Sequence, residues 1–203
     1  MLRSWIYLDN HDTARLATTL PEERARRLAQ VLQFTLPGSP NLYYGTEVDM
    51  PGDEDPEMRA PMRWDLVAQG HPALEWTRRL IALHRSERAL RVGDFRPCTA
   101  HRLLAFERHT DRAADTVIVI VNPHPEEVTE TVLVANSKLM DSSPMIDLLG
   151  TFTPGGEAGS TEAGLKVYAS LLHVTVPPYG ALVMRPDTAP PGGTRTTSGC
   201  GEG

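Results

Sequence analysis

A short apolar run near the start of the chain ends abruptly in polar residues. Trp5 to Leu8 is followed directly by Asp9-Asn10-His11-Asp12, and each of these four side chains can bind hydroxyl groups or ions. The pattern predicts a short strand that is buried along its length and opens into a polar site at its carboxyl end. Parallel-barrel enzymes carry their chemistry at that end of their strands. The first constraint is therefore a strand with a polar site at its tip.

A helix and a second strand follow at the spacing of a parallel crossover unit. The helix is predicted to begin with Pro21 in its first position, to carry acidic residues in its first turn, and to stop at Leu36-Pro37-Gly38. Gln30 is expected on its outer side, and Asn41–Gly45 is expected to form the second strand. The residues that recur at helical spacing, and so predict the buried face, are Ala25, Leu28, Val31, Leu32, Thr35 and Leu36.

The segment from Thr46 to Gly70 is rich in Pro, Gly and acidic residues and predicts a long irregular loop. A loop of that length in a compact domain is usually functional or disordered. Trp64 within it favours packing over disorder. A second helix is predicted from Pro72 to near Ser86. Its buried face is expected to contain Ala73, Trp76, Thr77, Leu80, Ile81 and His84.

After residue 92 the pattern changes to short runs of β-branched and apolar residues separated by turn clusters, with no helix between them. Such punctuation predicts an antiparallel β-sandwich. We therefore expect three parts: residues 1–90, residues 91–186, and a Gly-rich tail at 187–203 that has too little to bury to fold. The predicted strands are Leu103–Phe106, Thr116–Asn122, Val128–Val134, Met145–Leu148, Leu165–Tyr168, Leu172–Val176 and Ala181–Met184.

Composition excludes several kinds of partner. The 203-residue chain has a net charge of −6, which does not favour nucleic acid, and no apolar run approaches the length needed to cross a membrane. The N-terminus shows no secretory signal pattern, and Cys98 and Cys200 fall in contexts that do not favour a structural disulfide. We therefore expect a cytoplasmic protein. The scattered histidines have no zinc spacing, and the acidic loop does not fit a calcium loop, so no metal or cofactor is predicted.

Three motifs carry a family resemblance. Residues 7–12, Tyr-Leu-Asp-Asn-His-Asp, resemble the motif at the end of barrel strand seven in the alpha-amylase superfamily, glycoside hydrolase family thirteen. Residues 36–47 resemble the entry to strand eight and the strand itself, and residues 55–65 resemble the following loop in the neopullulanase, cyclomaltodextrinase and alpha-glucosidase branches. The resemblance implies an α/β part followed by an all-β part. These would be the last two βα units of a (β/α)8 TIM barrel and the C-terminal antiparallel β-sandwich.

The resemblance also implies roles for individual residues. Asp12 matches the third carboxylate of the family, which stabilises the distorted, cation-like sugar in the transition state. His11 matches a residue that hydrogen-bonds a hydroxyl of the same sugar. Asn10, Arg15 and Arg59 are further candidates for substrate binding, although Asn10 also suits a turn and Arg59 also suits pairing with the acidic loop. Arg15 is expected to pair with Asp12 and to hold its pKa down. The implied substrates are α-glucans or malto-oligosaccharides.

The family's nucleophile and general acid follow strands four and five, and nothing in this sequence matches them. Retaining hydrolysis needs both groups on the two sides of the glycosidic bond. We therefore expect the chain by itself to be inactive, and to associate with the missing barrel portion or with itself through open strand edges. Glu47 matches no catalytic position, so a structural role is expected for it. The alternative interpretations are a non-catalytic module that binds carbohydrate or protein, and an inactive truncated relic.

Overall fold

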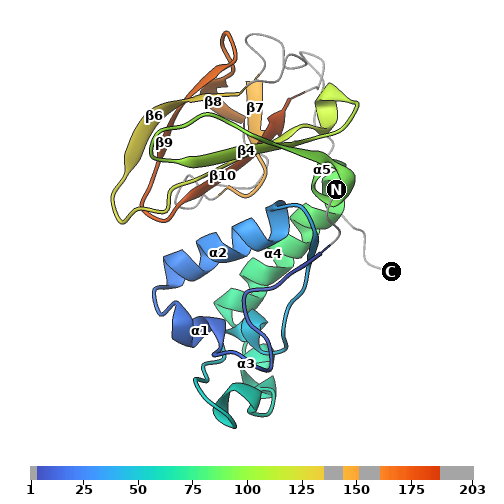
Figure 1. Ribbon diagram of the computed structural model, residues 1–203, viewed down its shortest axis with the longest axis vertical. Coiled ribbons are helices and arrows are strands. Elements are labelled where there is room, and N and C mark those ends of the chain that lie inside the picture. The colour runs from blue at the N-terminus through green and yellow to red at the C-terminus, as the bar shows by residue number, and fades with distance from the viewer. Residues whose placement is uncertain (1–3, 135–143, 151–160, 188–203) are drawn as a thin grey trace.

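The computed structural model describes residues 4–134, 144–150 and 161–187. A layer of helices lies beneath an antiparallel β-sandwich, and the chain passes from the helical layer to the sandwich once (Figure 1). The Gly-rich tail from residue 188 onward lies outside the described residues. Among the helices that the structure describes, none is both long enough and apolar enough to cross a bilayer.

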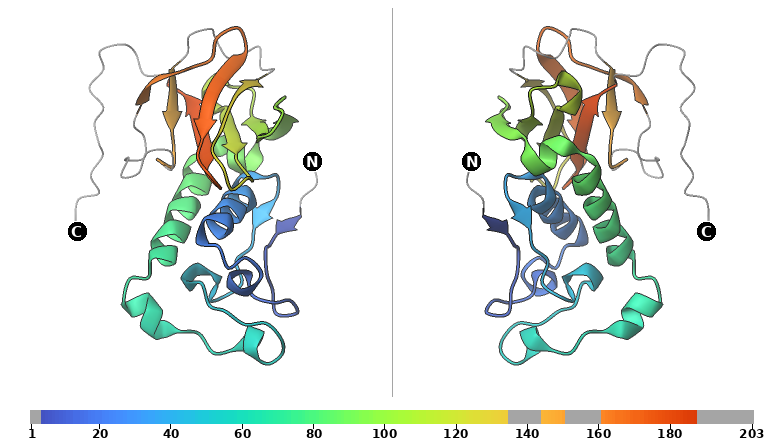
Figure 2. Two further views of the ribbon diagram at one scale, coloured as in Figure 1. Left: turned by 90° about the vertical axis from the view of Figure 1, so that its left-hand side faces the viewer. Right: turned by 90° about the vertical axis from the view of Figure 1, so that its right-hand side faces the viewer.

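The first part of the chain is a parallel strand-helix-strand unit. Strand β1 (Trp5–Ile6) pairs in parallel with β2 (Ser39–Pro40), and helix α2 (Glu23–Thr35) connects them. Figure 2 shows the two strands side by side at one edge of the helical layer. The parallel pair is confirmed, but the second strand lies before Asn41–Gly45. Asn41 still donates a backbone hydrogen bond of 2.8 Å to Ile6, and the chain then turns away through residues 43–45.

The expectation that β1 is buried along its length is wrong. The side chains of Trp5 and Tyr7 are 73% and 56% exposed, whereas Ile6 and Leu8 are partly buried. Within the part of the chain that the structure describes, β1 pairs with β2 alone. Successive strand residues face opposite sides, so the residues that do not face the helices are left open to solvent.

Helix α2 begins two residues later than expected. Glu22 is the N-cap and its carboxylate accepts a 3.4 Å hydrogen bond from the backbone N–H of Arg24, so Pro21 lies outside the helix. The prediction that Gln30 points outward is also wrong, because its side chain is 2% exposed. Gln33, one turn on, is equally buried and donates to the carbonyl oxygens of Ile6 and Asn41 at 3.1 and 2.7 Å. The Gln33 amide lets the helix pack on polar strand ends.

The irregular segment after β2 contains three short helices: 3-10 turns at Thr46–Val48 and Glu57–Arg59, and α3 (Trp64–Ala68). Trp64 is 71% exposed, so the inference that it packs is wrong. A four-residue helix, α1 (Leu16–Thr19), lies in the loop before α2. The predicted second helix is confirmed as α4 (Pro72–Ser86), and α5 (Arg88–Val92) follows it. Ile81 was predicted to lie on the buried face of this helix, but its side chain is exposed.

The remaining strands form two antiparallel sheets, as the sequence predicts. Six strands pair in the order β3-β4-β5-β10-β7-β8, and β6 pairs with β9. The sequence missed β3 because all four of its residues are exposed and carry no apolar pattern. The strands are β3 (Asp94–Pro97), β4 (Leu104–His109), β5 (Val117–Val121), β6 (Val128–Leu133), β7 (Pro144–Asp147), β8 (Thr161–Lys166), β9 (Leu171–Val176) and β10 (Ala181–Pro186).

Strand β5 explains how the two layers join. Its sequence, Val-Ile-Val-Ile-Val, is buried at every position. Ile118 and Ile120 face the β6–β9 sheet and belong to the core of the sandwich. Val117, Val119 and Val121 face the other way, into a core shared with Leu28, Val31, Trp76 and Leu80 of helices α2 and α4. A strand covered on both faces reads as a continuous apolar run. The division of the chain at residue 90 stays a prediction.

Candidate functional site

The polar stretch after β1 is anchored by a buried carboxylate. Asp9 is 3% exposed and accepts hydrogen bonds of 2.9 Å from the backbone N–H of Leu16 and from the hydroxyl of Thr46. The first bond satisfies the start of α1, where helix N–H groups lack partners. The second ties the end of β1 to the segment after β2. Asp9 therefore holds together the two segments on which the site is built.

Asn10 forms the turn that presents the next two residues. Its side-chain oxygen accepts a 2.8 Å hydrogen bond from the backbone N–H of Asp12, which is the geometry of an Asx-turn. Its own N–H donates to the Thr13 hydroxyl at 3.1 Å. The side-chain oxygen of Asn10 is thus engaged within the turn. Of the two roles suggested for Asn10, substrate binding and shaping of the turn, this geometry favours the second.

His11 and Asp12 project from this turn into solvent. The two side chains are 66% and 65% exposed, and His11 Nε2 lies 3.1 Å from Asp12 Oδ2. The guanidinium of Arg59 approaches from the loop after β2. Its Nε donates to the His11 carbonyl at 2.9 Å and its Nη2 lies 3.3 Å from Asp12 Oδ1. Arg59 Nη1 lies 3.8 Å from Asp55, so the same guanidinium joins the acidic loop to the turn.

The predicted pair between Arg15 and Asp12 is wrong. Arg15 is completely buried, and its guanidinium donates to the carbonyl of Tyr44 and stacks on the rings of Tyr43 and Tyr44, with centroids 4.3 and 4.6 Å away. Asp12 and Arg15 do not share a helix face, because α1 begins only at Leu16 and the Arg15 side chain is directed to Tyr43 and Tyr44. The cation beside Asp12 is Arg59, which is 47 residues away in sequence.

Gly45 makes the Arg15 contact sterically feasible. Its φ of +87° is in the left-handed region that favours glycine. A Cβ at this position would meet the sulfur of Met50 at 2.5 Å and Arg15 Nη1 at 3.1 Å. The Tyr43-Tyr44-Gly45 sequence is thus needed to turn the chain over the buried guanidinium. This support for Arg15 could not be predicted from the sequence, because the two segments meet only in the folded chain.

The chemistry available at the turn is that of one exposed carboxylate beside an imidazole and a guanidinium. Such a group accepts hydrogen bonds from hydroxyls and favours positive charge close to it. Glu47 is placed differently, because its Oε2 is buried without a hydrogen-bond partner among the described residues. Nowhere in residues 4–134, 144–150 and 161–187 do three or more His, Cys, Asp or Glu side chains gather as metal ligands.

Comparison with known proteins supports the family that the motifs indicated. Residues 1–77 match the family described as the alpha amylase catalytic domain. A cyclomaltodextrinase from Geobacillus thermopakistaniensis is 35% identical over 179 residues, 85% of this chain and 27% of that protein. An intracellular maltogenic amylase from Bacillus subtilis is 40% identical over 84 residues, 41% of this chain and 14% of that protein. The crystal structure of an Anoxybacillus alpha-amylase, 23% identical, superposes with a TM-score of 0.70 over 91% of this chain and 38% of that one.

The family match over residues 1–77 and the curated relatives point to the glycoside hydrolases. The chain belongs to the alpha-amylase family, glycoside hydrolase family thirteen. It spans between 21% and 28% of the length of the first curated relatives that it matches.

Proposed function

We propose that this chain provides one wall of the active site of an enzyme that hydrolyses or transfers α-glucosidic bonds in malto-oligosaccharides or related α-glucans. In this proposal β1 and β2 are the last two strands of a (β/α)8 barrel, and the β-sandwich follows the barrel. The observation that carries the proposal is the exposed His11–Asp12 pair at the carboxyl end of β1, held by Arg59. Active sites of parallel barrels lie at that end of the strands.

Each residue then has a distinct role. Asp12 stabilises the positive charge that develops on the sugar ring in the transition state, and His11 hydrogen-bonds a ring hydroxyl. Arg59 positions both, because it contacts the His11 carbonyl and the Asp12 carboxylate. Asn10 shapes the turn, and the buried Arg15 holds the segment after β2 through its contacts with Tyr43 and Tyr44.

Bond cleavage requires two further carboxylates, a nucleophile and a general acid about 5–5.5 Å apart in a retaining enzyme. We propose that strands outside this sequence supply them, and that the exposed Trp5 and Tyr7 face that part of the barrel. The chain by itself is then inactive. We also propose a cytoplasmic location, in keeping with the name of the Bacillus subtilis relative.

The test is turnover and binding of maltotriose by the purified chain, alone and mixed with a separately expressed polypeptide that carries the remaining strands of the barrel. We expect turnover only in the mixture, and a loss of about 10²–10⁴-fold for Asp12→Asn. Asp111→Asn is the matched control, because its carboxylate is 80% exposed in the connection between β4 and β5. Maltotriose binding without turnover in either sample would favour the alternative of a carbohydrate-binding module. Neither binding nor turnover would contradict both.

A further inference from the structure

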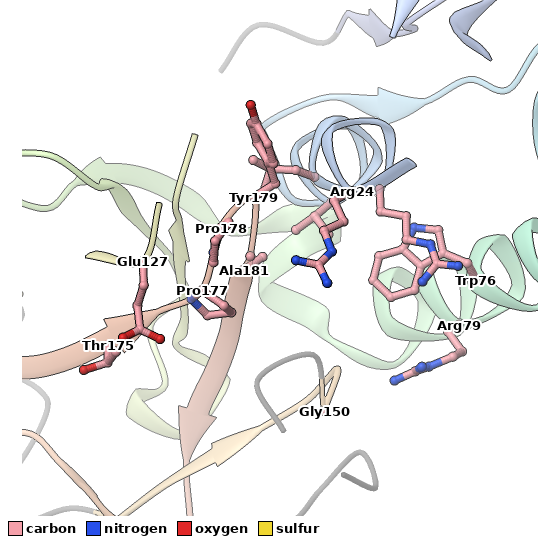
Figure 3. A pocket seen from close by; sticks show the side chains of 14 residues that line it. Arg24, Trp76, Arg79, Glu127, Gly150, Thr175, Pro177, Pro178, Tyr179 and Ala181 are labelled. Carbon is pink, nitrogen blue, oxygen red and sulfur yellow. The ribbon is translucent and has the colours of Figure 1, made fainter. Parts of the chain in front are cut away.

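A cavity of about 660 Å³ lies between the helical layer and the sandwich, and it shares no residue with the turn after β1. Helices α2 and α4 form one wall, and the Pro177–Ala181 turn before β10 forms the other. Figure 3 shows the side chains around it, with the Arg24 guanidinium between the Pro177 side and the Trp76 side. A volume of this size suits a small organic molecule.

The charged groups of the cavity are mainly basic. Three guanidinium groups line it, those of Arg24, Arg27 and Arg79, against the single carboxylate of Glu127. Arg27 forms an ion pair with Glu23, one helical turn before it. Arg24 forms no ion pair with any residue that the structure describes, in a chain whose net charge is −6. Positive charge gathered in a concave site of an acidic protein indicates an anionic ligand.

Two of the three arginines, Arg27 and Arg79, are restrained by contacts with other residues of the chain. Arg79 donates a hydrogen bond to the carbonyl of Leu149, and the guanidinium carbons of Arg27 and Arg79 lie 5.8 and 5.7 Å from the centre of the Trp76 ring. A guanidinium over an aromatic ring is attracted to the ring face, and this contact restricts its position. Arg27 and Arg79 are therefore restrained before any ligand arrives, which lowers the entropy cost of binding to this part of the wall.

The opposite wall is largely apolar. Pro177, Pro178 and Tyr179 line it beside Glu127 and Thr175, and the apolar Leu28 and Val31 of α2 also line the cavity. Guanidinium groups bind phosphate oxygens with paired N–H donors, and an apolar wall accommodates the carbon skeleton attached to them. We propose that this cavity binds a small organic phosphate, with the phosphate on Arg24 and Arg79 and the carbon skeleton against Pro177 and Tyr179.

The test uses Trp76 as the reporter. In the full-length chain, Trp5→Phe and Trp64→Phe remove the two exposed tryptophans and leave Trp76 as the only one. Glucose 6-phosphate is titrated at constant ionic strength, with glucose and inorganic phosphate as comparison ligands. We expect a saturable change in Trp76 emission with glucose 6-phosphate, weaker binding of inorganic phosphate, and no response to glucose.

Variants then locate the binding. Arg24→Gln and Arg24→Gln with Arg79→Gln are expected to weaken binding by about tenfold or more. Arg85→Gln, an exposed arginine farther along α4 that does not line the cavity, is the control and is expected to change affinity by less than about twofold. The single Arg24 variant keeps the test valid should loss of the Arg79 contact unfold the chain. Absence of saturable binding, or equal weakening by Arg85→Gln, would overturn the proposal. The proposal would also be overturned if glucose bound as tightly as glucose 6-phosphate, or if inorganic phosphate did.

Discussion

The guanidinium of Arg108 donates a 2.7 Å hydrogen bond to the backbone carbonyl of Thr35, a residue 73 positions earlier in the chain. Its other terminal nitrogen donates to the carbonyl of Gly93 at 3.0 Å, and the side chain is 1% exposed. One arginine on β4 thus ties the last turn of α2 and the entry to β3 to the sandwich. The last carbonyls of a helix lack partners within the helix, so this contact satisfies a group that burial would otherwise leave unpaired.

Replacing this arginine is expected to weaken the junction between the two layers. Arg108→Met keeps much of the side-chain volume but leaves the Thr35 and Gly93 carbonyls without the donor, at a cost of about 3 kcal/mol in the free energy of unfolding. Urea denaturation followed by circular dichroism measures the change. The exposed Arg112→Met serves as a control and is expected to change stability by less than about 0.5 kcal/mol. Equal effects of the two substitutions would contradict the role given to Arg108.

The bond between Asp9 and Thr46 predicts energetic coupling between the segments that follow β1 and β2. Asp9→Asn removes charge from the buried acceptor and is expected to lower stability by about 1–3 kcal/mol, and Thr46→Val by about 1 kcal/mol. Because the two side chains contact each other, the double variant should cost less than the sum, by about 1 kcal/mol. Thermal or urea unfolding of all four proteins gives this coupling energy. Strict additivity would show that the 2.9 Å contact contributes nothing.

The contact of Arg59 with the turn predicts that this side chain orders it. Arg59→Gln removes the donors to the His11 carbonyl and the Asp12 carboxylate, so the turn should open more often. We expect exchange of the Asp12 amide hydrogen, bonded to Asn10, to accelerate by about three- to tenfold. Hydrogen-deuterium exchange measures this. Arg63→Gln, which breaks only an exposed pair with Asp65, is the control, and an unchanged exchange rate in the Arg59 variant would sink the prediction.

His84 predicts a pH dependence of stability. Its Nδ1 lies 2.9 Å from the carbonyl of Phe34, and burial lowers its pKa below the usual value of about 6.5. A depressed pKa in the folded state means that folding favours the neutral ring. The stability it provides is present above pH of about 6.5 and is lost as the pH falls through the lower, folded-state pKa.

The free energy of unfolding should therefore fall less steeply between pH 7 and pH 5 in His84→Gln than in the unsubstituted chain. Urea titrations at a series of pH values measure the two slopes. His101→Gln, at an exposed position in the sandwich, should leave the slope unchanged. The same slope in the unsubstituted chain and in His84→Gln would show that burial of this ring does not couple to folding.

Elements with a clear pattern could be predicted from the sequence. The period of helix α4 and its Pro72 start gave its bounds, and the continuous run of β5 gave a buried strand. Exposed elements gave no such signal, which is why β3 was missed. The bounds of the second strand were wrong, because the chain turns at Gly45, within the segment Asn41–Gly45 that was predicted to be a strand.

The sequence by itself determined the polar strand end, since local propensity and residue type place Asn10, His11 and Asp12 in a turn after β1. Apolar periodicity likewise predicted the main helices of the first part of the chain and the strands of the second. Only the tertiary structure decided which cation lies beside Asp12. Arg15 packs against the Tyr43 and Tyr44 rings, and Arg59, from a loop distant in sequence, contacts Asp12 instead. Contacts between residues far apart in sequence depend on how whole helices and strands pack, and they cannot be predicted from the pattern of neighbouring residues.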